Sequence, residues 1–268
     1  MGRKLGRRGF AMLAGTMVVA GPVAAACAPG PTFDQWAATD GAAGRINLDQ
    51  VQEAFKESTS PTEFERRVNE IYEGDQVILI RSTQDGDKLV LEGFEDLDGS
   101  GTIDETADDV LFSIVKDQDN NELRGHGANG FYRSSFGGGN FLFTYLLISS
   151  LTGPRYYSTP RSRVSTIRSN RTRYRGSSGY RTQVSKNSSY FNRQKSFNSS
   201  RYNSAGRNLS RGRSSYLASN RSSGAFKNST TGVRSRWGAS SATRRSSGGF
   251  RGGGGAQSVV GFKRGRAG

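Results

Sequence analysis

Acidic and hydroxyl side chains alternate along one short segment of the chain, and their spacing is suited to binding a metal ion. The stretch DLDGSGTID begins at Asp96 and continues through Asp98, Ser100 and Asp104, with Gly101 near its middle. Calcium takes about six to eight oxygen ligands, which proteins supply from alternate positions around a sharp turn at glycine. The spacing therefore predicts a calcium site, and an aspartate- and glycine-rich turn without metal is the alternative interpretation.

This stretch resembles the first nine positions of an EF-hand calcium loop. The resemblance implies side-chain ligands from Asp96, Asp98 and Ser100, a carbonyl ligand from Thr102, and Asp104 at the ninth position. The flanking segments are predicted to be strands rather than two helices. The resemblance therefore implies an isolated, calcium-stabilised loop and not a paired calcium sensor.

The end of the loop departs from the EF-hand pattern. The twelfth position, which is normally a bidentate glutamate, is Ala107 in this chain. Asp108 or Asp109 reaches the ion only if the loop is one or two residues longer. Without the strongest ligand, we expect an affinity in the weak extracellular range, on the order of 10⁻⁴–10⁻³ M.

The N-terminal segment, residues 1–26, is typical of an export signal. It combines Arg3, Lys4, Arg7 and Arg8 with a following stretch of apolar and small residues. That stretch is shorter than the roughly 20 apolar residues of a spanning helix, so a removed signal peptide is predicted, with an uncleaved anchor helix as the alternative. The paired arginines also resemble the twin-arginine export motif, and the sequence does not decide between export routes.

The only cysteine of the chain, Cys27, directly follows this segment. The preceding residues, Val23-Ala24-Ala25-Ala26, resemble the lipobox of bacterial lipoproteins. The resemblance implies that Cys27 becomes the lipidated first residue of the mature chain and that residues 27–32 form a tether at the membrane. Cleavage after Ala26 or Ala28 with an unmodified cysteine is the alternative. A single cysteine excludes an intramolecular disulfide framework.

Positive and negative charges are separated along the chain. All 23 acidic residues lie in 34–122 together with 7 basic residues, whereas 123–268 contains 27 basic residues and no acidic one. From about residue 154 onward Ser, Arg, Gly and Asn dominate without sustained apolar periodicity. Such a composition buries too little apolar surface to offset the entropy of ordering the backbone. We therefore expect residues 154–268 to form a disordered basic tail.

An arginine-rich tail is suited to binding polyanions, because guanidinium groups make bidentate contacts with phosphate and carboxylate and stack on aromatic rings. Anionic polysaccharide, lipopolysaccharide, anionic lipid and nucleic acid all satisfy this chemistry. A solvated spacer with no fixed partner and a tail that folds back on the acidic head are the alternatives. Regularly spaced aromatic residues also favour self-association. The predicted polyanion-binding residues are Arg171, Arg173, Arg175, Arg211, Arg213, Arg244, Arg245 and Arg251.

Residues 33–125 contain local signals for an acidic α+β head. Asn47 is predicted to cap one helix, and Ser60 to cap a second that begins at Pro61 and stops at Gly74. Short apolar runs separated by turn residues predict three to four antiparallel strands, with the helix pair packed on one face. The runs lie at 77–80, 89–91, 110–115 and 122–124.

Residues 126–153 are predicted to form a Gly-rich and apolar hinge between the head and the tail. The apolar stretch 141–151 is expected to be a buried element that completes the head, and an interfacial segment lying on a membrane is the alternative.

Few residues suit catalysis. His126 is the only histidine, and no nucleophile–base pair, cluster of His or Cys residues or phosphate-binding loop is recognisable. We therefore expect a non-catalytic, exported, lipid-anchored envelope protein whose tail binds an anionic surface polymer or lipid. The alternative is an intracellular RNA- or DNA-binding protein, because the segment Arg251-Gly252-Gly253 echoes RGG-type nucleic-acid binders.

Overall fold

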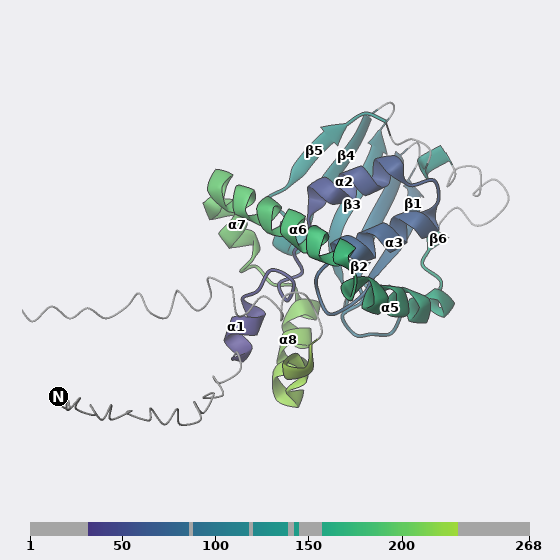
Figure 1. Cartoon of the computed structure of the whole chain (residues 1–268). Coiled ribbons are helices and arrows are strands. Elements are labelled where there is room, and N and C mark those ends of the chain that lie inside the picture. Colours follow the sequence, from purple (N-terminus) through teal and green to yellow (C-terminus); the bar gives the residue numbers. More distant parts are fainter. Residues whose placement is uncertain (1–31, 86–87, 118–119, 139–141, 145–156, 230–268) are drawn as a thin grey trace, which may run out of the picture. The chain divides into compact units, whose positions relative to one another are not determined.

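The structure is a computed structural model that describes residues 32–85, 88–117, 120–138, 142–144 and 157–229. These residues form an α+β fold (Figure 1). The helices are α1 (Phe33–Ala37), α2 (Leu48–Glu57), α3 (Pro61–Ile71), η1 (Gly127–Asn129), α5 (Arg161–Arg175), α6 (Ser178–Phe197), α7 (Ser199–Ala205), α8 (Arg211–Ser223) and η2 (Ala225–Asn228). The strands are β1 (Ile78–Asp85), β2 (Lys88–Glu95), β3 (Asp109–Asp117), β4 (Asn120–Gly125), β5 (Arg133–Phe136) and β6 (Tyr157–Ser158).

The two helices predicted from local signals are confirmed. The Asn47 side chain accepts a hydrogen bond from the Gln50 amide at 3.2 Å, which caps α2. Ser60 caps α3 in the same way by accepting from the Glu63 amide at 3.2 Å. These side-chain oxygens satisfy amide groups that have no partner within the helix, so both helices begin where the sequence predicts.

The predicted stop at Gly74 is wrong. Helix α3 ends at Ile71, and Gly74 is not among the glycines with a positive φ. Glycine is required there for another reason, because a Cβ at this position would lie 2.0 Å from the Tyr72 hydroxyl oxygen. The constraint is therefore close packing by a neighbouring ring and not a left-handed helix end.

The sheet is a meander extended at both ends. Strands β1 to β4 pair in sequence order and antiparallel, as predicted, with a bulge between Gly93 and Phe94. Strand β5 adds beside β4, and the short β6 adds beside β1, which gives the order β5-β4-β3-β2-β1-β6. The described sheet thus has six strands rather than the predicted three or four.

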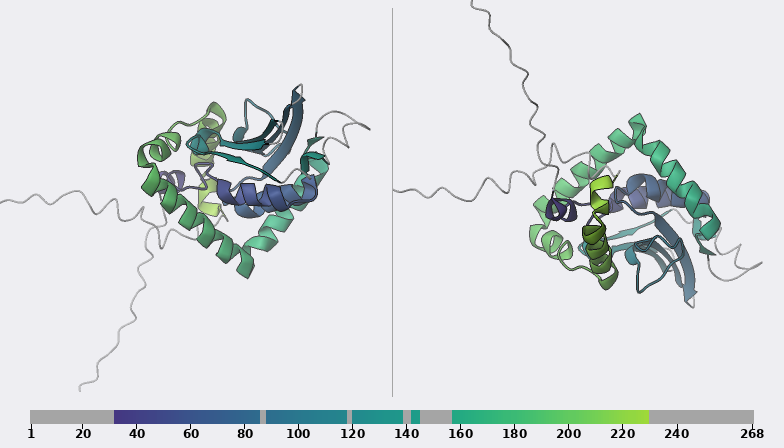
Figure 2. Two further views of the ribbon diagram at one scale, coloured as in Figure 1. Left: turned by 90° about the horizontal axis from the view of Figure 1, so that it is seen from above. Right: turned by 90° about the horizontal axis from the view of Figure 1, so that it is seen from below.

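One face of the sheet is covered by two successive layers of helices. Helices α2 and α3 lie directly on it, and α5 and α6 form a wedge on the side of α2 and α3 away from the strands (Figures 1 and 2). The main core contains Phe55 and Phe64 from the first layer and Phe112 from the sheet. Tyr190 and Tyr202, from α6 and α7, belong to the same core and are fully buried.

The prediction of a disordered tail is wrong for residues 157–229, which contain β6 and helices α5 to α8. We call residues 157–229 the arm. Residues 230–268 lie outside the described part of the chain. Eight arm residues with apolar or aromatic side chains are buried: Val164, Ile167, Tyr180, Tyr190, Phe191, Tyr202, Tyr216 and Phe226.

The helices of the arm could not be predicted from its composition, for a physical reason. Each helix buries only a narrow set of side chains, and most of the remaining positions are polar, chiefly Ser, Asn and Arg, so the apolar periodicity is weak. The ordering entropy is offset by surface that the head supplies, as where Trp36 packs with Tyr216 and Phe226. The evenly spaced aromatic residues of the arm are therefore core anchors.

The apolar hinge is described only in part. Leu142 and Phe143 are buried in the main core, as the core-completing interpretation of 141–151 predicts for them. Residues 145–151 lie outside the described chain. Among the described helices, none has the length and apolar character needed to cross a membrane.

Candidate metal centre and basic helical surface

The loop between β2 and β3 brings three carboxylates together. Oxygen atoms of Asp96, Asp98 and Asp108 lie within 4.8 Å of one another. The loop turns sharply because Gly99 and Gly101 adopt left-handed conformations, with φ of +73° and +74°. Three hard oxygen donors at this separation suit a divalent, oxygen-seeking cation.

The rest of the predicted ligand set does not join this cluster. The Ser100 hydroxyl donates to the Thr102 carbonyl oxygen at 2.9 Å, so these two groups satisfy each other. The Asp104 side chain is exposed and accepts from the Thr106 hydroxyl at 2.7 Å and from its amide at 2.8 Å. These hydrogen bonds hold the pKa of Asp104 below its usual value. Of the predicted ligands, Asp96 and Asp98 thus lie in the carboxylate cluster, together with Asp108, which was expected to reach the ion only from a longer loop.

Asp108 also closes the loop. One of its carboxylate oxygens accepts from the Leu97 amide and the other from the Asp104 amide, both at 2.9 Å. Burial raises the pKa of Asp108 to about 6, and the charges of Asp98 and Asp96 act in the same direction. Burial likewise raises the pKa of Asp96. Burial penalises the charged form of both carboxylates, and a bound cation would offset that penalty.

An arginine from the arm occupies part of the same space. The Arg168 Nη2 atom lies 3.1 Å from Asp96 Oδ2 and 3.4 Å from the Gly99 carbonyl oxygen. Asp96 is fully buried in this arrangement, whereas Arg168 is half exposed. The guanidinium group supplies the positive charge that a metal ion would supply, so the two compete for Asp96.

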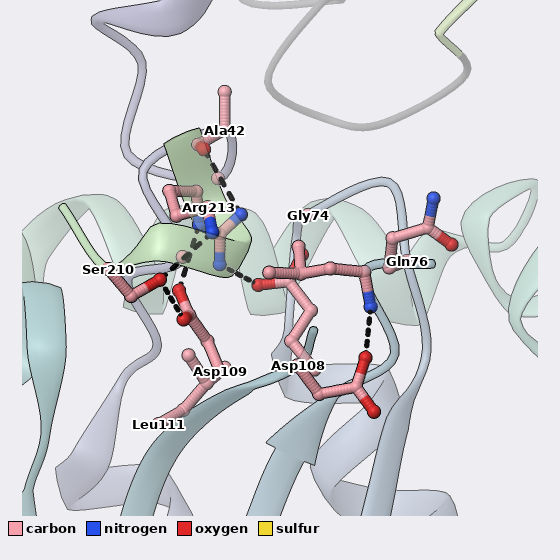
Figure 3. A network of polar contacts seen from close by, with 12 residues as sticks. Ala42, Gly74, Gln76, Asp108, Asp109, Leu111, Ser210 and Arg213 are labelled. Atoms are coloured by element: carbon pink, nitrogen blue, oxygen red, sulfur yellow. Dashed lines mark hydrogen bonds and ion pairs between the residues drawn. The ribbon is translucent and has the colours of Figure 1, made fainter. Parts of the chain in front are cut away.

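Arg213, which was predicted to bind an external polyanion, is instead buried inside the protein. Both Arg213 and Glu95 are 1% exposed, and they form an ion pair. Arg213 also donates to Asp109 at 3.1 Å and to the Ala42 carbonyl oxygen at 3.3 Å (Figure 3). Burial alone would lower the pKa of Arg213, but Glu95, Tyr72 and Asp109 together outweigh burial and raise the pKa. The prediction for Arg213 is therefore wrong.

Arg171 is corrected in the same way. Its guanidinium group is buried and donates to backbone carbonyl oxygens in the last turn of α3 and just beyond it, including Asn69 at 3.2 Å and Gly74 at 2.8 Å. These acceptors are left without helical partners where α3 ends, so Arg171 acts as a cap supplied from another helix. Arg175 donates to the same Gly74 carbonyl oxygen at 2.6 Å. A weakly hydrated, multiply donating guanidinium group suits this role.

Other arm cations remain on the surface. Of the predicted polyanion-binding residues, Arg173 and Arg211 are exposed, and no ion pair or hydrogen bond joins their side chains to another described residue. Five further cations of the arm, which the sequence analysis did not single out, share these properties. We call this set of seven the basic helical surface: Arg161, Arg173, Arg181, Arg201, Arg207, Arg211 and Lys227. Cys27, Arg244, Arg245 and Arg251 lie outside the described residues.

One contact between a hydroxyl group and a histidine was not apparent from the sequence. Ser113 Oγ lies 2.8 Å from His126 Nε2, where β3 meets the segment after β4. Burial lowers the pKa of His126, which favours the neutral ring, and with a neutral ring either atom can donate. A pocket lies between α3 and α5 and is lined by residues such as Glu65 and Arg163, but neither Ser113 nor His126 lines it. We therefore assign the contact as a structural hydrogen bond.

The chain was also compared with known proteins. Comparison with protein-family models, with curated proteins and with solved structures gave no match.

Proposed function

We propose that this chain is a non-catalytic protein of the cell envelope, exported and anchored through a lipid on Cys27. Its basic helical surface binds an anionic surface polymer. The observation that carries the binding part is that seven cations of the arm face solvent without an acidic partner among the described residues. They lie in a stretch of chain, 123–268, that contains no acidic residue.

The cations of the arm divide into two groups by their contacts. One group is paired with carboxylates of the head, and includes Arg163 on Glu65 at 2.8 Å, Arg193 on Asp49 at 3.0 Å and Arg213 on Glu95. These residues dock the arm on the acidic head. The basic helical surface is what remains after this docking, so its field is not cancelled by neighbouring carboxylates. Such a field attracts polyanions and accelerates their association.

The choice of an envelope polymer rests on the N-terminal signal and the cysteine that follows it. In the envelope, the available polyanions are mainly anionic polysaccharide, lipopolysaccharide and lipid headgroups, whereas most nucleic acid stays in the cytoplasm. Mass spectrometry of the N-terminus from native cells tests this part. A diacylglyceryl group on Cys27 is expected, and a retained Met1 would instead favour the intracellular RNA- or DNA-binding alternative.

Removal of cations from the basic helical surface is expected to lower the affinity for polyanions. It is also expected to make that affinity less dependent on salt concentration. The variant Arg161→Gln/Arg173→Gln/Arg181→Gln loses three exposed charges. Each phosphate or sulfate contact that is lost is expected to reduce the slope of log K against log salt by about one. Titration with heparin, and in parallel with lipopolysaccharide, between about 50 and 200 mM salt measures this change.

The matched control for this variant is Arg66→Gln. Arg66 is a partly exposed arginine on α3 that is already paired with Glu70 at 2.6 Å, so its loss is expected to leave heparin affinity unchanged. Equal heparin affinity for the triple variant and the parent protein would refute the assignment of binding to this surface.

We further propose that the β2–β3 loop binds calcium weakly through Asp96, Asp98 and Asp108. The supporting observations are the three clustered oxygens and the raised pKa values of Asp96 and Asp108. When bound, the ion would link the end of β2 to the start of β3 and shield the carboxylates from one another. This role is structural and requires no catalytic chemistry.

Calcium at about 5 mM is expected to stabilise the full chain by roughly 1–2 kcal/mol, as mass action predicts for a dissociation constant of about 10⁻⁴–10⁻³ M. Thermal unfolding with and without calcium measures this effect. Asp98→Asn keeps an oxygen for the Ser100 amide but removes a ligand charge, so it is expected to abolish the response. Asp104→Asn, outside the cluster, is the control and is expected to respond like the parent. A parent Tm that is indifferent to calcium would remove the proposal.

A further inference from the structure

Two large apolar side chains of the described chain are conspicuously exposed, and both lie in one short stretch of the arm. Phe197 is 84% exposed at the last position of α6, and Leu209 is 42% exposed in the loop between α7 and α8. We call residues 193–211, which contain both, the α6–α7 corner. Figures 1 and 2 show α7 and the adjoining end of α6 at the periphery of the helical layers.

The α6–α7 corner is also strongly basic. It contains five cations and no acidic residue: Arg193, Lys195, Arg201, Arg207 and Arg211. Arg201, Arg207 and Arg211 belong to the basic helical surface and are exposed without a side-chain partner among the described residues. The other positions are mostly Ser and Asn. The exposed Phe197 therefore lies in a stretch of chain whose charged residues are all positive, although one of them, Arg193, is paired with Asp49.

The corner is held rigidly by a buried anchor. Tyr202 is fully buried, and its hydroxyl group lies 3.1 Å from both Asp40 Oδ1 and Arg45 Nη1. The ring of Phe131 lies 5.1 Å from the ring of Tyr202. Because this anchor fixes α7 to the head, Phe197 is exposed by the fold and is not a fraying end.

We propose that the α6–α7 corner docks on an anionic lipid bilayer, with Phe197 inserted at the interface and the surrounding cations on the headgroups. The inference rests on the proposed envelope function and names the lipid surface as the partner of this part of the arm. Apolar side chains that enter the boundary between headgroups and acyl chains act together with electrostatic attraction to anionic lipids. Each nearby cation adds to that attraction within a Debye length.

The apolar residue distinguishes a bilayer from a soluble polymer. A hydrated anionic polysaccharide offers charge but no apolar phase, so an exposed phenylalanine gains nothing from contact with it. A bilayer offers both, and transfer of an aromatic side chain out of water is favourable. Single-stranded nucleic acid offers stacking on bases as the other use of an exposed ring, and the experiment separates this use from membrane docking.

The test uses the chain from residue 27 onward with Cys27→Ser, so that neither an acyl chain nor the apolar N-terminal segment anchors the protein. Flotation is measured with phosphatidylcholine vesicles that contain about one quarter phosphatidylglycerol, at near-physiological salt. Phe197→Ala is expected to lower partitioning about tenfold, equivalent to about 1.4 kcal/mol. Its heparin affinity and its Tm are expected to equal those of the parent, because the side chain is 84% exposed. The neighbouring variant Ser196→Ala is the control and is expected to bind vesicles like the parent.

Arg201→Gln separates charge from insertion, because it is expected to weaken vesicle and heparin binding together. Vesicle binding by Phe197→Ala at the level of the parent would overturn the inference. A loss confined to a single-stranded oligonucleotide would overturn it in favour of base stacking. A parent that binds heparin but no anionic vesicle would overturn the inference and leave the proposed function standing, whereas a parent that binds neither would refute the proposed function.

Discussion

Replacement of Arg213 by alanine is expected to lower the free energy of unfolding by about 3–5 kcal/mol, measured by urea denaturation at pH 7. Arg213 and Glu95 are both 1% exposed, and Arg213 also bonds to Asp109 and to the Ala42 carbonyl oxygen. The variant leaves the Glu95 carboxylate buried without its counter-charge. Breaking a buried pair is costly for this reason, even where the intact pair contributes little net stability.

The loss is expected to depend on pH. Burial raises the pKa of Glu95 even beside Arg213, and removal of the arginine raises it further. An acid whose pKa is raised by folding destabilises the folded state above that pKa, and the penalty is relieved as the pH falls and the group takes up a proton. The deficit of Arg213→Ala is therefore expected to be largest near neutral pH and smaller in acid.

Two further variants make this prediction specific. Arg211→Ala removes an exposed arginine two positions away on the same helix and is expected to leave stability unchanged. The double variant Arg213→Met/Glu95→Gln removes both charges of the fully buried pair and is expected to recover much of the loss, because Glu95 is no longer charged and only Asp109, which Ser210 still contacts, loses a partner. An urea midpoint for Arg213→Ala equal to that of the parent would contradict the buried ion pair and the docking of α8.

A chain that ends at residue 160 is expected not to fold cooperatively. The deletion removes the eight buried apolar and aromatic arm residues and uncovers their partners on the head, among them Trp36 and Leu97. Burial of one such side chain is worth about 1.5–3 kcal/mol, so the set is comparable with the total stability of a domain, about 5–15 kcal/mol. It also leaves Glu95 and Glu65 without Arg213 and Arg163.

Circular dichroism and the urea unfolding curve of the truncated chain measure this effect. A chain that ends at Ser229 is the control, because it keeps every buried contact of the arm described above, and it is expected to unfold like the full chain. A cooperative transition at the parent midpoint for the chain ending at residue 160 would show that the head is independent of the arm.

The first part of the fold was predictable because its signals are local. Asn47 and Ser60 cap the helices that follow them, and the apolar runs between turn residues mark β1 to β4. Each of these features depends on residues within a few positions of one another. Strand β6 has only two residues and pairs with β1, which is distant in sequence, so no local pattern predicts it.

The candidate metal centre was predictable only in part for a similar reason. Asp96 and Asp98 are placed by the spacing of the loop, and both join the cluster. The pattern of a twelve-residue loop ends at Ala107, whereas the folded loop closes one residue later through the bonds that Asp108 makes to two backbone amides. Arg168, which competes at Asp96, comes from a helix that is distant in sequence.

The sequence by itself determined the separation of charge, the α+β character of the head and the N-caps of its two helices, because these follow from composition and from interactions between near neighbours. Only the tertiary structure decided what the arm does. One residue type, arginine, has three roles there: Arg213 is a buried counter-charge, Arg171 caps carbonyl groups, and Arg173 is a solvent-exposed cation. Composition cannot distinguish these roles, because each depends on the carboxylates, carbonyl groups or solvent that the folded head places opposite the side chain.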